Sequence, residues 1–363
     1  MHEFNTPEWD ALSGMQPFLK HAFLLALESS GCASAATGWQ PQHLGLWRNG
    51  RLAAAMPLYL KSHSYGEYVF DWRWADAYEQ AGGRYFPKLV CAVPFTPIPG
   101  LRLLADSDDD RLHLIETVLT FAVEAGLSYF HCLFPQVDSD AAFTEAGLMQ
   151  RLGYQFHWPN PGYENFDEFL ATLAHDKRKK IRQERRKVFD AGLRFEIRTG
   201  NEIREADWAF FHRCYVHTYR LHRSTPYLNL DFFLSLGEAL PGHTMMVLGY
   251  RGIQPVCAAL NLHDGERLYG RYWGSLEFVP SLHFEACYYQ GMEFCIGQKL
   301  KIFEGGAQGE HKLARGFLPV VTRSWHWLAD DRFGKAVSEF LRRESHAMEN
   351  YVSELEGPYR KNQ

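Results

Sequence analysis

The sequence lacks the signatures of several large enzyme classes. It contains no GxSxG nucleophile elbow, no HExxH zinc motif, no P-loop and no Rossmann glycine pattern in its proper context. These absences argue against serine hydrolases, zincins, nucleoside triphosphatases and nicotinamide-dependent enzymes. A zinc finger or RNP signature is also missing, so we expect no sequence-specific binding of nucleic acid.

Cysteine is sparse, and its spacing suggests neither disulfides nor metal. The chain has seven cysteines, mostly inside apolar runs, and none forms a CxxC pair. An odd number of buried thiols is typical of a reducing compartment, so we expect a cytoplasmic protein without a metal. We recognise no signal peptide, and no apolar run reaches the roughly 18 residues of a membrane-spanning helix.

The composition is that of a folded protein with an uneven charge distribution. The 363 residues are 46% hydrophobic and 22% charged, and this length suits two domains. The net charge is -5, but Lys177 to Lys187 contains eight basic residues and one acid, Glu184. That segment carries +7, which leaves -12 for the rest of the chain. The pattern predicts a localised site for an anionic partner; the alternative is a solvated basic face.

Hydrophobic periodicity predicts mixed strands and helices in both halves of the chain. In the first half we expect strands at 44–47, 52–60, 67–74, 127–134 and 154–158, and helices at 111–125 and 141–152. A long basic helix is expected at 165–189. In the second half we expect strands at 193–197, 245–250, 255–262, 267–273, 301–304 and 322–328, and helices at 206–219, 230–240, 282–300 and 333–355.

The two halves show signs of an internal repeat. Leu46, Gly50 and Leu58 align with Leu248, Gly252 and Leu260 at an offset of 202, and 66–70 parallels 265–269 at an offset of 199. The alternative is chance similarity between two β-meanders. We predict an N-terminal domain at 1–160, a basic connecting helix at 161–192, a C-terminal domain with the active site at 193–330, and a C-terminal amphipathic helix at 331–363.

The densest polar cluster follows the strand that ends at Glu304. Four glycines lie between residues 304 and 316, together with polar side chains that could bind a ligand. Glycines let the backbone approach a ligand and expose its N–H groups, and α/β sheets bind ligands at strand ends. The alternative is a solvated surface loop. The polar residues of this cluster are Gln308, Glu310, His311, Lys312 and Arg315.

The helix that begins near residue 282 carries a second candidate group. Helical spacing places Glu285 and Tyr289 on one mainly apolar face, in the first turn. Burial would raise the pKa of this carboxyl group and the helix N-terminus would lower it, so Glu285 is either a general base or a structural cap. His283 is a helix-entry hydrogen bonder or a site residue.

Two further segments suggest ligand contacts. The strand 268–274 contains Arg271, Tyr272 and Trp273, a cation beside aromatic rings; ordinary packing of sheet aromatics is the alternative. On the basic helix, Arg178, Lys179 and Arg182 could contact phosphates of tRNA or CoA.

Five of these segments together resemble a bacterial family of predicted N-acyltransferases labelled "peptidoglycan biosynthesis/recognition". The segments are 176–189, 226–233, 268–274, 282–289 and 306–317. The family is distantly similar to the Fem aminoacyltransferases, which add amino acids from aminoacyl-tRNA to peptidoglycan precursors. The resemblance implies an α/β fold of tandem GNAT-like domains, with mixed, mostly antiparallel sheets flanked by helices.

Two departures from the resembled families concern the donor. GNAT enzymes hold the CoA pyrophosphate with a Q/R-x-x-G-x-G/A turn, but the nearest match here, 271–276, ends in Leu276. Fem enzymes often carry a coiled-coil arm for tRNA, whereas this chain has no long heptad insertion. The donor is therefore left open between acyl-CoA and aminoacyl-tRNA.

The sequence thus predicts transfer of an acyl or aminoacyl group to an amine, with a glycopeptide cell-wall precursor as one candidate acceptor. Glu285 or His311 is the expected base, and Lys312 or Arg315 assists the backbone amides that bind the oxyanion. The helix opening at His283 and the glycine-dense segment must then meet in one site. Alternatives are a non-catalytic recognition protein and an RNA-associated protein. The expected substrate-binding residues are Arg271, Tyr272, Trp273, His283, Tyr289, Glu304, Gln308, Glu310 and Arg315.

Overall fold

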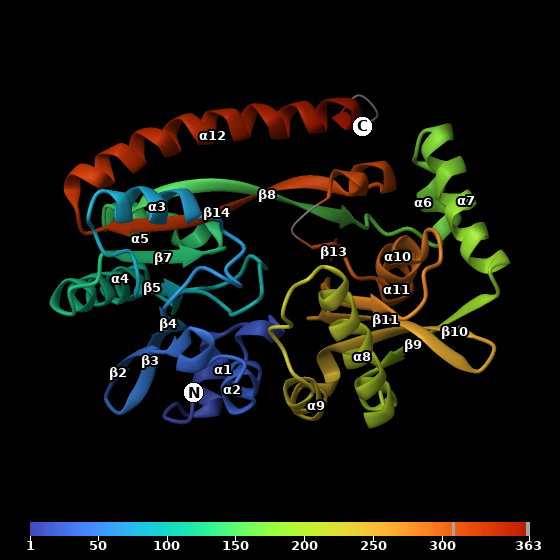
Figure 1. The fold of residues 1–363 in the computed structure, drawn as a ribbon, viewed down its shortest axis with the longest axis horizontal. Helices are drawn as coiled ribbons and strands as arrows, with labels where there is room; N and C mark the ends of the chain where they lie inside the picture. The colour runs from blue at the N-terminus through green and yellow to red at the C-terminus, as the bar shows by residue number, and fades with distance from the viewer. Residues whose placement is uncertain (307–308, 361–363) are drawn as a thin grey trace. The chain divides into compact units, whose positions relative to one another are not determined.

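The protein has a mixed α/β fold that divides into two compact units (Figure 1). The computed structural model describes residues 1–306 and 309–360, with side chains up to residue 355. The first unit comprises residues 1–154 and 321–363, and the second comprises residues 155–320. The strands of each unit are mixed and mostly antiparallel, belong largely to one 11-stranded sheet, and are flanked by helices. The predicted fold class is therefore confirmed.

The main sheet of the first unit runs in the order β1–β4–β5–β7–β14–β8. Among the pairings recorded for these strands, β5 with β7 is parallel and the others are antiparallel. A second, three-stranded sheet has the order β2–β3–β6. The strands are β1 (Trp39–Pro41), β2 (Leu44–Arg48), β3 (Arg51–Met56), β4 (Leu58–Lys61), β5 (Lys88–Cys91), β6 (Leu104–Ala105), β7 (Tyr129–Leu133), β8 (Met149–Pro159) and β14 (Leu318–Leu328).

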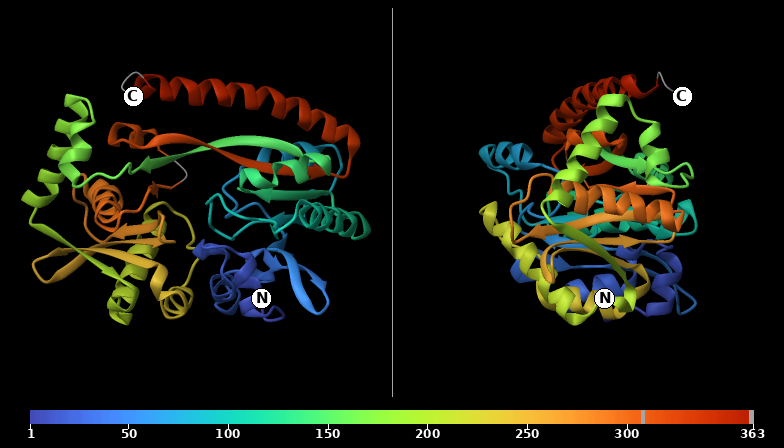
Figure 2. Two further views of the ribbon diagram at one scale, coloured as in Figure 1. Left: turned by 180° about the vertical axis from the view of Figure 1, so that it is seen from behind. Right: turned by 90° about the vertical axis from the view of Figure 1, so that its right-hand side faces the viewer.

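Alternation along β7 gives the main sheet of the first unit two differently covered faces. Phe130 and Cys132 pack into the core beneath α4 (Asp108–Glu124) and α5 (Asp140–Glu145). Tyr129 faces the other way and packs with α3 (Trp72–Gln80) and α12 (Asp331–Arg360). Figure 2 shows the long α12 helix from two further directions. Two short helices, α1 (Thr6–Leu12) and α2 (His21–Ser29), complete this unit.

The sheet of the second unit continues from the end of β8 through β13–β12–β11–β10–β9. Its parallel pair is β12 with β13. A bulge interrupts β12, because Leu260 pairs with Tyr272 while the next residue, Asn261, pairs with Gly270. The strands are β9 (Leu193–Thr199), β10 (Thr244–Arg251), β11 (Gln254–His263), β12 (Arg267–Ser275) and β13 (Ile302–Glu304).

Helices cover both faces of this second sheet. On one face α8 (Glu205–Leu221) packs against β11 and β12, and α9 (Leu230–Ala239) packs on α8. On the other face lie α7 (His175–Asp190) and a helix that runs from Leu282 to Gln298. That helix consists of α10 (Leu282–Phe284), a π-helical turn (Glu285–Tyr289) and α11 (Gln290–Gln298).

Most of the predicted elements are confirmed, and four need correction. Segment 67–74 is no strand: its aromatic residues belong to a loop, with Phe70 exposed, and to α3, which packs Trp74 inward. The predicted strand 52–60 is two strands in different sheets, because Pro57 has no N–H to continue the ladder. The predicted helix 141–152 ends at Glu145, and Gly147 with φ of +76° leads into β8.

The fourth correction concerns the long basic helix. It is two helices, α6 (Phe166–Ala171) and α7, because Ala174 between them is extended with ψ of 148°. The proposed repeat holds for the two hairpins β2–β3 and β10–β11, but segment 66–70 is not a strand like its counterpart 265–269. The predicted domain boundaries stay a prediction, since the contacts group α7 with the second unit and α12 with the first.

Close packing of α8 on β12 depends on Gly274. A Cβ atom at this position would lie 2.1 Å from the carbonyl oxygen of Cys214, which belongs to the backbone of α8 and has little room to move.

Among the described helices, none has the combination of length and hydropathy needed to cross a bilayer.

We therefore expect Gly274→Ala to lower the free energy of unfolding by about 1–3 kcal/mol, because α8 must shift away from the sheet. The matched control is Gly297→Ala in α11, where a Cβ would meet nothing within 4 Å. That control should raise stability by about 0.5–1 kcal/mol through helix propensity. Urea denaturation of both variants measures the difference, and equal midpoints would contradict this account of the packing of α8.

Candidate functional site

The basic helix α7 buries one narrow face. Ile181, Glu184 and Val188, spaced three and four residues apart, are at most 7% exposed, whereas most of the surrounding cations face outward. Glu184 is the only acidic residue of the basic run. A buried carboxylate needs a partner, and its partner comes from a segment more than a hundred residues away.

Arg315 is that partner, and it joins three elements of the second unit. Its Nη2 donates to Glu184 Oε1 at 2.6 Å, its Nε donates to the hydroxyl of Tyr289 at 3.1 Å, and its Nη1 donates to the carbonyl of His311 at 2.6 Å. The guanidinium also lies 3.5 Å from the ring centroid of Phe284. The hydroxyl of Tyr289 in turn donates to Glu184. Since Arg315 is 2% exposed, these contacts form a buried clamp.

A second ion pair links α7 to the π-helical turn. Arg185 donates from Nη2 to Glu285 Oε1 at 2.9 Å and from Nε to Glu285 Oε2 at 3.1 Å. It also donates from Nη1 to Glu293 Oε1 at 2.7 Å. Burial lowers the pKa of Arg185, but hydrogen bonds and charge from Glu293 and Glu285 raise it more, so it stays cationic. The carboxylate of Glu285 is thus held in a bidentate pair, and Gln290 donates to it as well.

The π-helical turn aims two adjacent tyrosines at different partners. Tyr289 is directed toward Glu184 and Arg315, while the hydroxyl of Tyr288 lies 3.0 Å from Nε2 of His311. Burial raises the pKa of both phenols above the ordinary value, so both remain protonated at neutral pH. π-helical turns inside α-helices are frequent at functional sites.

His311 is an exposed titratable group of this cluster. It lies on the 3₁₀ helix Glu310–Arg315, its side chain is exposed, and its ring is 6.4 Å from that of His283 and 5.6 Å from that of Phe284. Partial burial and the charges of Arg315 and Lys312 lower its pKa, so the imidazole is neutral at pH 7. The helix opening at His283 and the glycine-dense segment therefore meet, as the predicted site requires.

Lys312 holds the glycine-dense segment against the same helix. Its Nζ donates to the carbonyl of Gly306 at 2.8 Å, and burial lowers its pKa to about 8. Gly306 and Gly309 have φ of +91° and +110°, which other residues rarely adopt. Lys312 thereby ties Gly306 to the 3₁₀ helix that carries His311.

The ring of His283, which lies near that of His311, packs in turn on Trp273. Trp273 packs on His283 with ring centroids 4.8 Å apart, and both side chains are half-buried. Burial lowers the pKa of His283 to about 4, so this imidazole is uncharged at neutral pH. Burial also raises the pKa of the neighbouring Cys287 well above its ordinary value, so a thiolate nucleophile is not available there.

Glu304 lies at the end of β13 and is 1% exposed. Arg267 donates to its Oε1 at 3.0 Å, while its Oε2 lies 3.7 Å from Nε2 of His157. Burial raises the pKa of Glu304 to about 7 and lowers that of His157 to about 3. Glu304 is thus buried inside the sheet, between β8 and β12, and its predicted role in substrate binding stays a prediction.

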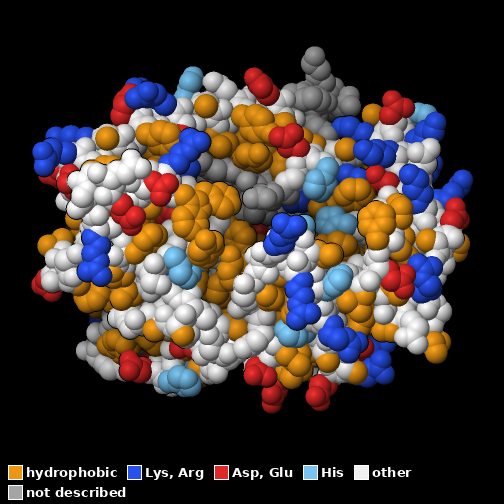
Figure 3. All heavy atoms as spheres, viewed as in Figure 1, with side chains coloured by type: hydrophobic (Ala, Val, Ile, Leu, Met, Phe, Trp, Pro, Cys, Tyr) orange, Lys and Arg blue, Asp and Glu red, His pale blue; other side chains and the backbone are white. Residues whose placement is uncertain are grey.

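The outward face of α7 forms a separate basic surface. An open depression of about 490 Å³ lies between α6 and α7. Lys and Arg side chains gather over these two helices at the right-hand edge of the view (Figure 3). Asp167 is the acidic residue of its lining and pairs with Arg182 at 3.0 Å. The charged lining residues are Asp167, His175, Arg178, Lys179, Arg182 and Arg186.

The structure brings some of the predicted site residues together and separates others. His283, Glu285, Tyr289, His311, Lys312 and Arg315 gather around the π-helical turn, with Trp273 beside them and the exposed Glu310 next to His311. Tyr272 points to the opposite face of the sheet, where its ring contacts Tyr215 and Phe233, and Arg271 lies over that ring. Gln308 lies outside the described residues. The roles of all these residues remain predictions.

Sequence reasoning missed Glu184, Arg185 and Tyr288. The only available signal was the lone acid inside the basic run, which is unusual on a helix that merely faces solvent. Nothing in the local sequence indicates that Arg185, one of eight similar cations, turns inward.

Comparison with known proteins gives one family and several similar folds. The FemAB-like family, described as peptidoglycan biosynthesis/recognition, matches residues 1–361. The crystal structure of FemX aligns with a TM-score of 0.56 at 11% identity, covering 92% of this chain and 98% of FemX.

Two further solved structures are similar in fold, with comparable TM-scores and sequence identities. The C-terminal domain of a putative lysylphosphatidylglycerol synthetase from Agrobacterium fabrum aligns with a TM-score of 0.54 at 9% identity, covering 94% of this chain and 96% of that domain. L-PGS from Bacillus licheniformis aligns with a TM-score of 0.51 at 11% identity, covering 89% of this chain and 95% of that one. No curated protein matches the sequence.

Proposed function

This chain belongs to the FemAB-like family of peptidoglycan biosynthesis/recognition, and from that premise we propose that it transfers an acyl or aminoacyl group to a primary amine, with His311 as the general base. The observation that carries the proposal is an exposed, neutral imidazole whose Nε2 lies 3.0 Å from the hydroxyl of Tyr288 and whose backbone carbonyl accepts from Arg315. The similarity in fold to FemX and to the lysylphosphatidylglycerol synthetase domain supports the same class of reaction.

The chemistry needs a base that accepts a proton from the attacking amine as the new amide bond forms. The amine nitrogen attacks the donor carbonyl, and the thiol or hydroxyl of the donor leaves as the tetrahedral intermediate collapses. When Nε2–H of His311 donates to the hydroxyl of Tyr288, Nδ1 carries the free lone pair that takes this proton. The structure fixes the distance to Tyr288 but not the tautomer, so this tautomer is part of the proposal.

In this proposal Glu285 is not the general base, which was one of the two roles that the sequence suggested for it. Its two carboxylate oxygens already accept hydrogen bonds from Arg185 and Gln290. It serves as a positioning residue that fixes the π-helical turn against α7. Arg315 and Lys312 position the segment that carries His311 rather than touch the oxyanion, because both side chains are buried and donate to the protein itself.

The donor is anchored in this proposal by the basic depression between α6 and α7. Arg178, Lys179 and Arg182 offer a positive surface to phosphates, which both acyl-CoA and aminoacyl-tRNA carry. The acceptor amine approaches His311 along the half-buried rings of Trp273 and His283. A glycopeptide cell-wall precursor is the acceptor class that the family description favours.

The direct test is a transfer assay with the purified full chain. Acetyl-CoA and an aminoacyl-tRNA are offered separately as donors, with a lysine-containing muropeptide as acceptor, and the amide product is identified by mass spectrometry. The proposal expects amide formation from one of the two donors. Binding of the muropeptide without product from either donor would instead favour a non-catalytic recognition protein.

The pH profile should show where the imidazole titrates. Since the pKa of His311 lies below its ordinary value of about 6.5, the base is already deprotonated at neutral pH and becomes inactive only on acidification. With a weakly basic acceptor such as methoxyamine, which stays unprotonated in this range, we expect kcat/KM to be level at neutral pH and to fall below about pH 6.5. A fall that begins above pH 7 would contradict this assignment.

Reversing three charges on α7 should weaken donor binding without changing the fold. We expect the variant Arg178→Glu, Lys179→Glu, Arg182→Glu to raise the Kd of the active donor at least tenfold. It should also flatten the dependence of log Kd on log salt by roughly 0.7 for each phosphate that α7 no longer neutralises. Fluorescence anisotropy at several salt concentrations measures both effects.

The control for this experiment carries the same change in charge elsewhere. Arg73→Glu, Lys299→Glu, Lys301→Glu alters three exposed cations outside α7. Equal losses of affinity in the two triple variants would show that the effect is one of net charge, and would contradict a specific site on α7.

A further inference from the structure

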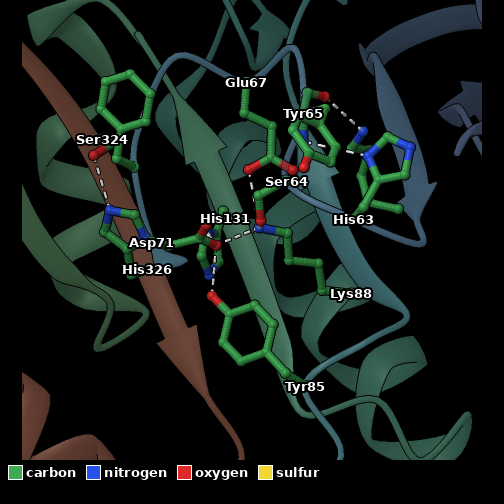
Figure 4. Close-up of polar contacts among 12 residues, drawn as sticks. His63, Ser64, Tyr65, Glu67, Asp71, Tyr85, Lys88, His131, Ser324 and His326 are labelled. Carbon is green, nitrogen blue, oxygen red and sulfur yellow. Dashed lines mark hydrogen bonds and ion pairs between the residues drawn. The ribbon is translucent and has the colours of Figure 1, made fainter. Parts of the chain in front are cut away.

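A fully buried polar cluster lies in the first unit, between the main sheet and α3 (Figure 4). It gathers side chains from the loop before α3, from β5 and from β7, and none of its charged members is more than 3% exposed. Such a group is costly to bury unless every charge and lone pair is matched. Its central members are Glu67, Asp71, Lys88 and His131.

Lys88 donates to only one of the two oxygens of each carboxylate. Its Nζ donates to Ser64 Oγ at 2.8 Å, to Glu67 Oε2 at 2.9 Å and to Asp71 Oδ2. The hydroxyl of Tyr85 donates to the same Asp71 oxygen at 2.6 Å. Each carboxylate therefore uses one oxygen for these donors and keeps the other for a different partner.

Four other polar atoms of the cluster make no hydrogen bond among the described residues, although Nδ1 of His131 lies 3.7 Å from Asp71 Oδ2. Glu67 Oε1, Asp71 Oδ1 and both ring nitrogens of His131 are buried and make no hydrogen bond there. Unmatched buried acceptors are rare in folded proteins, because each costs roughly 1–3 kcal/mol. When both carboxyl groups are ionised, their free oxygens can only accept. An electron-poor group between Glu67 Oε1 and Asp71 Oδ1 would then satisfy both of them.

One donor atom from each of Glu67, Asp71 and His131 lies within 4.8 Å of the other two. Two carboxylates and an imidazole form the ligand set that binds first-row divalent metals, with Zn²⁺ requiring small side-chain shifts to reach ligand distances of about 2.0–2.2 Å.

We propose that Glu67, Asp71 and His131 bind a divalent transition-metal ion, Zn²⁺ by ligand type, in the first unit. Lys88 stays bound to the opposite oxygens of both carboxylates and orients them. His326 of β14 is the nearest candidate for a fourth ligand, because its ring centroid is 4.5 Å from that of His131 and its Nδ1 has no partner in the described structure. Its Nε2 is already 2.8 Å from Ser324 Oγ, which fixes the ring.

This ion would join two segments that are distant in sequence. Asp71 immediately precedes α3, Glu67 belongs to the loop before it, and His131 is central in β7. Binding would therefore couple the position of α3 on the sheet to the presence of metal. The sequence alone leads us to expect no metal, because the three ligands follow no motif spacing and lie up to 64 residues apart.

The test begins with the metal content of the full chain, purified without chelator and measured by inductively coupled plasma mass spectrometry. We expect about one zinc per chain, and an increase in Tm when Zn²⁺ is returned to chelator-treated protein. Co²⁺ in place of Zn²⁺ should give a visible absorption spectrum, which a purely structural hydrogen-bond cluster would not produce.

Two variants and one control decide the assignment. Glu67→Gln, nearly identical in shape, and His131→Ala should both lose the bound zinc and its stabilising effect. Glu28→Gln is the control, since Glu28 also pairs with a histidine and a cation, His43 and the N-terminus, but belongs to no group of three metal-ligating side chains in the described structure. If His131→Ala does not fold, Glu67→Gln decides. Chelator-treated wild type that binds no Zn²⁺ or Co²⁺, or Glu67→Gln that keeps the full zinc content, would overturn the proposal.

Discussion

Replacing Arg315 by methionine is expected to lower the free energy of unfolding of the second unit by about 3–5 kcal/mol. Most of this loss of stability comes from the buried polar groups that are left without their partner, and less from the lost attraction between the two charges. Glu184 would stay 7% exposed with its charge uncompensated by the guanidinium, and the carbonyl of His311 would lose its donor. Chemical denaturation followed by tryptophan fluorescence measures the change.

The surrounding residues supply the controls for Arg315. Arg182→Met removes the partner of Asp167 in an exposed pair and should cost less than about 1 kcal/mol. The double variant Glu184→Leu, Arg315→Met removes both buried charges and should recover much of the stability, because an apolar pair often replaces a buried ion pair at little cost. A double variant as unstable as the sum of the two single variants would contradict the clamp.

Removing the imidazole of His311 is expected to reduce kcat for amide formation by about 10²–10⁴-fold while leaving KM nearly unchanged. The reason is that the base acts on the proton that leaves in the transition state and contributes little to binding of the ground state. His311 is exposed, and its side chain bonds to Tyr288. His311→Ala should therefore keep its denaturation midpoint close to that of the wild type.

Two comparison variants separate catalysis from positioning. His113→Ala removes an exposed histidine from α4 in the first unit and should leave kcat unchanged. Arg185→Met, which frees Glu285, should lower stability as well as kcat, because Glu285 and Glu293 lose their cation. If His311→Ala kept its full rate while Arg185→Met lost activity without loss of stability, Glu285 would be the better candidate for the base.

The order and type of most elements in the second unit could be predicted from the sequence, because strong alternation and helical periodicity coincide there. The meeting of the Leu282 helix with the glycine-dense segment could also be predicted, since β12 and β13 are neighbouring strands and both segments leave the same sheet. Gly306 and Gly309 in that segment have positive φ, which glycine adopts readily.

The side-chain partners could not be predicted, because they depend on contacts between residues about a hundred positions apart. Nothing in the local sequence distinguishes Glu285 as a base from Glu285 as the partner of Arg185. The strand predicted at 67–74 was wrong for a related reason. Its aromatic residues suit a strand, but the side chain of Asp71 is buried against Lys88, and α3 begins at the next residue. Tertiary contacts outweigh local propensity in such segments.

Chemical rescue of His311→Ala by free imidazole asks directly whether His311 is the base. We expect amide formation by this variant to rise with imidazole concentration, because the exposed position of the ring leaves room for the added base. Imidazole should not restore Arg315→Met, in which the native histidine is present but displaced. A His311→Ala protein that is unaffected by imidazole, or that is fully active without it, would contradict the assignment of His311 as the base.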